Sequence, residues 1–141
     1  MSTLNLGAAR AIVDGALQHA RQQGYKPMGV AVVDAAGDLI AFLREDGASA
    51  LRLDIATGKA AAAVGMGANS RALAERAATL PAFFATIATA SGRKFIPQTG
   101  AVLIVDADGK VLGAAGASGG TSDEDEDIVK AGIEAAGLRH A

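Results

Sequence analysis

The stretch Lys110–Ile128, KVLGAAGASGGTSDEDEDI, decides how this chain is organised. It begins as an apolar run, continues through a turn rich in glycine and serine, and ends in five consecutive acidic residues that open a helix. Strand–loop–helix junctions are common ligand sites, because glycines let the backbone approach a bound molecule closely. The acids would repel a phosphate, and the spacing is not that of a dinucleotide fingerprint. The junction is therefore predicted to be a pocket wall for a ligand other than a nucleotide.

Composition limits both fold and function. A chain of 141 residues predicts one domain, residues 1–141, with a real hydrophobic core. Hydrophobic residues make up 50% and aromatic residues only 4%, so the core is expected to consist of Ala, Val, Ile and Leu. A net charge of −2 without a basic block argues against nucleic-acid binding. The absence of cysteine excludes disulfides, thiolate metal sites and a cysteine nucleophile.

The sequence also predicts a location. No apolar segment reaches the ~18–20 residues of a membrane span. The N-terminal residues lack the basic region and apolar run of a signal peptide. We therefore expect a cytoplasmic protein without membrane contacts.

Hydrophobic periodicity predicts the order helix, hairpin, helices, hairpin, helix. Each hairpin has two apolar runs around a turn that ends in glycine, D-A-A-G in the first and D-A-D-G in the second. This order predicts an α+β fold with helices on both faces of one sheet. The predicted elements are a helix over Leu4–Gln23, hairpins over Met28–Arg44 and Gly100–Gly116, helices over Ala50–Met66, Arg71–Ala78 and from Pro81, and a last helix over Ser122–Ala136.

Two residues predict the start of the last helix. Ser122 and Asp125 have the spacing of an S-x-x-D capping box. The acids of the first turn also suit the positive end of the helix dipole.

Four motifs together resemble the GlcG/HbpS-type haem-binding-protein family. They are the VVDAAG turn, REDGA at Arg44–Ala48 for the family's RMDGA, LDIATGKAAAA at Leu53–Ala63 for D-I-A-x-x-K-A-x-T-A, and GAAGASGGTSDEDEDI at Gly113–Ile128 for G-A-x-G-V-S-G-x-x-x-x-Q-D. The resemblance runs from about Leu4 to Leu138. The chain is also similar to the C-terminal domain of PduO-type corrinoid adenosyltransferases.

The resemblance implies a fold and a mode of action. It implies a profilin-like α+β sandwich, in which a curved five-stranded antiparallel sheet is flanked by helices. It also implies a homo-oligomer, a dimer or larger, that binds a small ligand, with haem as the family's cofactor. Asp38 follows Gly37 where many members carry histidine, and Glu45 replaces a methionine. We therefore expect weak or no haem binding, with His19 and Tyr25 as the remaining candidate iron ligands.

The resemblance places six candidate ligand-binding residues: Arg44, Asp46, Lys59, Ser118, Gly119 and Asp125. Each also has a structural interpretation. Arg44 could anchor a ligand carboxylate or form a surface pair with Asp46. Lys59 could bind an anion or act as a base, or it could extend to solvent. Ser118 could bind a ligand or satisfy the glycine turn, and Asp125 could simply cap its helix. Consecutive acids on a helix point in several directions, so no metal site is expected.

Three hypotheses about function remain open. The first is a small-ligand-binding protein, whose ligand is haem or another carboxylate-bearing molecule. The second is an enzyme on the same scaffold, with Lys59 or Asp46 as acid or base. The third is a structural or accessory oligomer.

Overall fold

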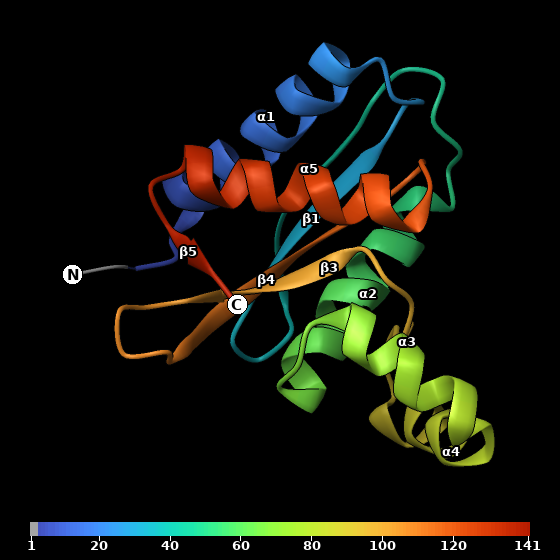
Figure 1. The fold of residues 1–141 in the computed structure, drawn as a ribbon. Coiled ribbons are helices and arrows are strands. Elements are labelled where there is room, and N and C mark those ends of the chain that lie inside the picture. The colour runs from blue at the N-terminus through green and yellow to red at the C-terminus, as the bar shows by residue number, and fades with distance from the viewer. Residues whose placement is uncertain (1–2) are drawn as a thin grey trace.

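The helices and strands of the computed structural model, which describes residues 3–141, follow the predicted order (Figure 1). Within these residues the chain forms five helices and five strands, and each predicted hairpin and helix is present. The elements are α1 (Leu6–Gln23), β1 (Gly29–Asp34), β2 (Leu39–Arg44), α2 (Arg52–Met66), α3 (Ser70–Thr79), α4 (Pro81–Ser91), β3 (Ala101–Val105), β4 (Val111–Ser118), α5 (Ser122–Ala135) and β5 (Arg139–His140).

The five strands form one antiparallel sheet in the order β2-β1-β4-β3-β5. The two hairpins are joined in the centre, where β1 pairs with β4. In one row of the sheet, Gly29 lies between Arg44 of β2 on one side and Ser118 of β4 on the other. This confirms the expected five-stranded α+β fold.

Both faces of the sheet are covered by helices. On one face, α1 and α5 pack with Ile12 and Ile128 over Val30 and Val102. On the other face, the alanines of α2 pack over Leu103, Ala114 and their neighbours. The helices α3 and α4 extend from α2 away from the sheet (Figure 1). Phe84 of α4 packs in one buried cluster with Ala62 of α2 and Leu73 of α3.

The two hairpin turns use the same hydrogen bonds. In the first, Asp34 Oδ1 accepts from the backbone N–H groups of Ala36 and Asp38, at 2.9 and 3.0 Å. In the second, Asp106 Oδ1 accepts from two N–H groups at the same offsets. The closing glycine has φ 86° in the first turn and 83° in the second. An aspartate that bonds its own backbone is a common way to fix such turns.

The start of the last helix differs from the prediction by one residue. Thr121 and Glu124, rather than Ser122 and Asp125, form the reciprocal capping box of α5. Thr121 Oγ1 accepts from the N–H of Glu124, whose carboxylate accepts from the N–H of Thr121. The shift matters because it leaves the Asp125 side chain available to the interior.

No helix among residues 3–141 is both long enough and apolar enough to cross a membrane.

Candidate functional site

The most buried charges of the described chain are Lys59 and Asp125. Their side chains come from α2 and α5, on opposite faces of the sheet, and meet past its end with Nζ and Oδ2 2.9 Å apart. Lys59 is 5% exposed and Asp125 is 3% exposed. Burial raises the pKa of the Asp125 carboxyl above its ordinary value, and the Lys59 ammonium and the Gly120 N–H offset part of this rise.

Gly100, just before β3, makes room for this ion pair. A Cβ at this position would lie 2.7 Å from Lys59 Nζ and 3.0 Å from Asp125 Cβ. Its φ of 134° is also one that residues with side chains rarely adopt. The pair therefore depends on a glycine at the end of the sheet.

The ion pair fixes the backbone on both sides of Ser118. Lys59 Nζ donates to the carbonyl of Ala117 at 2.9 Å, and Asp125 Oδ1 accepts from the N–H of Gly120 at 2.9 Å. Lys59 is thus engaged by Ala117 and Asp125. Acid–base chemistry at Lys59 would first require separating it from a buried carboxylate.

Ser118 has a partner that the sequence did not indicate, Arg52. The Arg52 Nη1 group, at the first residue of α2, donates to Ser118 Oγ at 2.8 Å. The arginine side chain crosses the sheet above Gly29, where a Cβ would lie 2.8 Å from Arg52 Cβ. Gly119 follows with φ 148° and packs against the backbone of Pro27.

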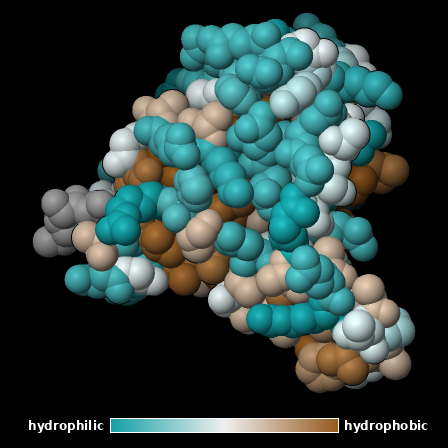
Figure 2. All heavy atoms as spheres, viewed as in Figure 1, coloured by the Kyte–Doolittle hydropathy of each residue, from teal (hydrophilic) through white to brown (hydrophobic). Residues whose placement is uncertain are grey.

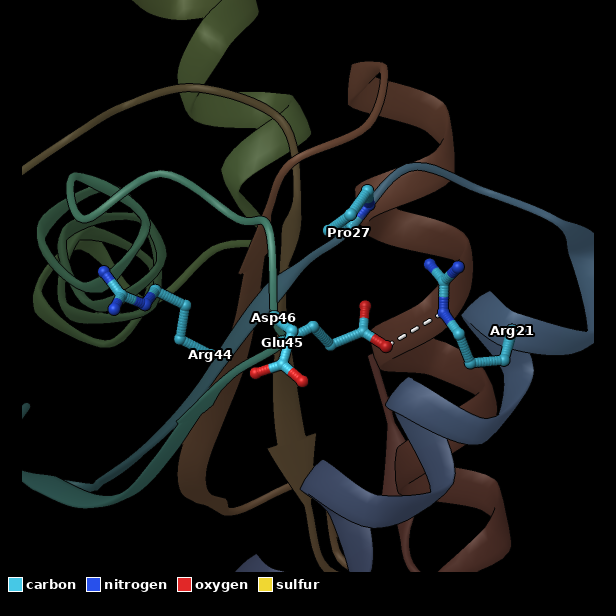
Figure 3. Close-up of a pocket in the computed structure, with 5 residues that line it drawn as sticks. All are labelled: Arg21, Pro27, Arg44, Glu45 and Asp46. Carbon is cyan, nitrogen blue, oxygen red and sulfur yellow. Dashed lines mark ion pairs between the residues drawn. The ribbon is translucent and has the colours of Figure 1, made fainter.

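Arg44 and Asp46 line an open cavity of about 440 Å³, together with Arg21, Pro27 and Glu45 (Figure 3). Glu45 links two elements here, because its carboxylate accepts from the N–H of Met28 at 2.8 Å and pairs with Arg21 Nε at 2.9 Å. Figure 3 shows that Arg44 points away from Arg21. Within residues 3–141, the Arg44 guanidinium forms no ion pair, with Asp46 or with another side chain.

The six candidate residues therefore fall into two groups. Lys59 and Asp125 lie close to Ser118 and Gly119 at the buried end of β4. Arg44 ends β2, and Asp46 follows it on the exposed side of the sheet. Gly29 connects the two groups, since it pairs with Arg44 and with Ser118. Side chains that are opposite each other in antiparallel strands share a face, so Arg44 and Ser118 lie on the same face of the sheet as Gly29. A Cβ on Gly29 would lie 2.8 Å from Arg52 Cβ, so this is the face covered by α2.

The five consecutive acids do not converge on one point, because they contact different groups of the protein. Asp123 and Glu126 both pair with Arg71, Glu124 caps the helix, and Asp125 binds Lys59. Among residues 3–141, no group of three or more histidines and acids has the arrangement of a metal site.

Asp127, the last of these acids, binds the two candidate haem ligands. Its Oδ2 atom lies 2.9 Å from His19 Nε2 and accepts a 2.9 Å hydrogen bond from the Tyr25 hydroxyl. That hydrogen bond raises the pKa of Tyr25 above its ordinary value. Neither the cavity at Arg44 nor a second one between α1 and β2 is lined by His19 or Tyr25.

An open five-stranded antiparallel sheet with helices on both faces defines an α+β domain, and a buried Lys–Asp pair joins its two helical layers at one end. The chain belongs to the HbpS-like family, described as haem-degrading protein HbpS-like, whose model matches residues 4–134.

Solved structures agree with this assignment. HbpS of Streptomyces reticuli, as a double mutant, is 32% identical with a TM-score of 0.80, covering 95% of this chain and 87% of that one. A PduOC–haem complex is 25% identical with a TM-score of 0.84, covering 98% of each chain. Klebsiella pneumoniae protein ORFY, at 22% identity and TM-score 0.83 over 97% and 92% of the two chains, shares the fold. No curated protein has a significant sequence match.

Proposed function

We propose that this protein is a cytoplasmic small-ligand-binding protein that acts as a homo-oligomer and recognises its ligand through carboxylate groups. The observation that carries the proposal is the row Arg44, Gly29, Ser118, with Arg52 lying across the glycine. Two strand spacings separate Arg44 from Ser118, roughly 10 Å between backbones. This is the scale of a small-ligand site.

The chemistry of the row favours an anion. Arg44 is exposed, and Arg52 uses one Nη group on Ser118, so most of their donors remain for a ligand. A guanidinium group presents a planar fork that binds a carboxylate through two parallel hydrogen bonds. The helix α2 begins at Arg52 without a side-chain cap, so its positive end adds to the attraction.

In this proposal Lys59 and Asp125 position the site rather than contact the ligand. They bind the backbone of Ala117 and Gly120, on either side of the Ser118–Gly119 segment. Asp46, in the same cavity as Arg44, would orient that guanidinium once a ligand is bound.

Haem belongs to the proposed class of ligand, because its propionates are carboxylates. The relatives support a small ligand, since one solved structure is a PduOC–haem complex. The candidate iron ligands of this chain fit haem poorly. His19 and Tyr25 are both engaged by Asp127, and neither lines the two cavities beside α1. We therefore propose a carboxylate other than haem as the ligand.

Native mass spectrometry of the purified protein, with titrations of haem and of a panel of mono- and dicarboxylates, tests the proposal. A bound small carboxylate is expected, and Arg44→Ala and Arg52→Ala should each weaken it at least ~10-fold, since hydrogen bonds to charged groups contribute ~1.5–3 kcal/mol. The matched control is Arg76→Ala, because Arg76 is an exposed arginine of α3 far from the row.

Two results would contradict the proposal. One is that no carboxylate binds above the background of the Arg76→Ala control. The other is a stoichiometric haem complex with a sharp Soret band that depends on His19 or Tyr25 and is unaffected by loss of Arg44.

The proposed assembly has its own support. Several large apolar side chains are at least half exposed, including Leu43, Leu51 and Phe83 at 50%, 62% and 52%. Covering such side chains is a common reason for association.

A further inference from the structure

The cavity at Arg44 contains charges that the protein does not use. All its lining residues except Pro27 are charged (Figure 3). Two of them bind each other, because Arg21 Nε and a carboxylate oxygen of Glu45 are 2.9 Å apart. Arg44 and Asp46 are both exposed, and neither forms an ion pair within residues 3–141. The unused groups of the cavity are therefore one guanidinium and one carboxylate.

The fold has no need of the Asp46 side chain. The turn after β2 is closed by the backbone, since the N–H of Ala48 donates to the carbonyl of Glu45 at 3.1 Å. Gly47 supplies the left-handed conformation of this turn, with φ 86°. No donor within residues 3–141 forms a hydrogen bond with the Asp46 carboxylate, in contrast to the aspartates of the two hairpin turns. This carboxylate is thus available to a cation.

We propose that the ligand of this cavity is a small amino carboxylate, a molecule that carries an ammonium group as well as a carboxylate. The inference rests on the proposed function and narrows its ligand class. The carboxylate binds the Arg44 guanidinium, and the ammonium donates to Asp46. A carboxylate has two oxygens, so Asp46 can orient Arg44 through one and bind the ammonium through the other.

The charge balance of the cavity disfavours the simpler ligands. A dicarboxylate would bring its second carboxylate towards Asp46 and Glu45, and like charges repel. A plain monocarboxylate would neutralise Arg44 and leave Asp46 without a partner. An amine that lacks a carboxylate would meet Arg44 with the same sign of charge. Only a ligand with both charges satisfies both unused groups.

Other cavities suit such a ligand less well. Figure 2 shows brown and tan surface over α4, and the cavity there is lined by alanine and threonine alone. In the cavity between α2 and α4, the guanidinium of Arg93 already pairs with Asp38 at 2.7 Å. The cavity between α1 and β2 has two unpaired charges, Arg10 and Asp14. These are four residues apart on one helix, where opposite charges attract each other across a turn.

Isothermal titration calorimetry of the full chain with four compounds tests the inference. The compounds are butanoate, 2-aminobutanoate, 4-aminobutanoate and pentanedioate. The better of the two amino acids should bind roughly 2- to 5-fold more tightly than butanoate, the range expected for one ion pair at an open surface. Pentanedioate should bind more weakly than either amino acid.

Two variants and two controls assign this preference to residues. Asp46→Ala should make the affinities for butanoate and the preferred amino acid equal, whereas Arg44→Ala should weaken the binding of both. Asp108→Ala is the matched control, because Asp108 is also an exposed aspartate that precedes a glycine in a turn. It should keep the wild-type preference, and so should Asp14→Ala. Far-UV circular dichroism checks that each variant is folded.

The ratio of the two affinities separates the outcomes. A preference for an amino acid that disappears in Asp46→Ala and persists in both controls supports the inference. Equal binding by the wild-type protein, or a preference that survives Asp46→Ala, overturns the inference and leaves carboxylate binding standing. Loss of the preference in Asp14→Ala overturns it as well, because the ammonium would then bind in the cavity between α1 and β2. If none of the four compounds binds, the inference fails, and the proposed function fails with it only when the wider panel of carboxylates also shows no binding.

Discussion

Lys59 and Arg44 are two cations to which the sequence motifs assign the same role, and the structure gives them opposite environments. Lys59 is 5% exposed and engages a carboxylate and a carbonyl, whereas Arg44 is exposed beside an open cavity. A buried charge whose donors are satisfied by the protein mainly holds the structure together. An exposed guanidinium without a protein partner is available to a ligand. Two cations that the same motifs single out therefore differ in role: Lys59 mainly stabilises the fold, and Arg44 is available to a ligand.

The largest effect is expected from Lys59→Met, which keeps the length of the side chain and removes its charge. It leaves the buried Asp125 without its ammonium partner, and breaking a buried pair in this way costs about 3–5 kcal/mol of unfolding free energy. Urea unfolding followed by circular dichroism measures the loss. Lys110→Met is the control, because Lys110 is exposed in a turn, and it should change stability by less than about 0.5 kcal/mol. Equal losses of unfolding free energy in Lys59→Met and Lys110→Met would show that the buried lysine is no more important for stability than an exposed one.

A double-mutant cycle sharpens the same comparison. Asp125→Leu alone leaves the Lys59 ammonium buried and unpaired, whereas K59M/D125L removes both charges. The double variant should therefore lose less stability than the two single variants added together, by about 0.5–3 kcal/mol. Additive losses in the cycle, measured by urea unfolding, would mean that the two side chains act independently.

The smallest effect on stability is expected from Arg44→Ala. Its guanidinium forms no ion pair within residues 3–141, so the unfolding free energy should stay within about 0.5 kcal/mol of wild type. Thermal and urea unfolding of the variant, run beside its carboxylate titration, show whether binding is lost without loss of stability. A destabilised Arg44→Ala protein would place this residue in the same structural class as Lys59.

The elements of the fold could be predicted because their signals are local. The helical spacing of apolar residues, the left-handed glycines after α1 and in the turns, and the two aspartate turns all act within a few positions. The start of α5 was predicted one residue too late. T-S-D-E-D offers two possible capping boxes, and the structure uses Thr121 with Glu124, the pair that has glutamate at the third helical position.

The geometry of the site could not be predicted from local signals. Lys59 and Asp125 are 66 positions apart, and their contact requires that α5 start at Ser122, so that Asp125 faces inward. Arg52 reaches Ser118, also 66 positions away, only because Gly29 lies between β2 and β4 and carries no side chain. Such contacts follow from strand order and register, which the motifs did not contain.

The Lys59–Asp125 pair also bears on how the native state opens. α2 and α5 cover opposite faces of the sheet, and each could in principle detach with its own layer. The pair joins the two helical layers beside Gly100, just before β3 begins. Releasing either helix would therefore leave the charged side chain of the other helix without its partner. The amide hydrogens of the two helices should therefore exchange with solvent in one cooperative event, close to the free energy of global unfolding, rather than as two independent units.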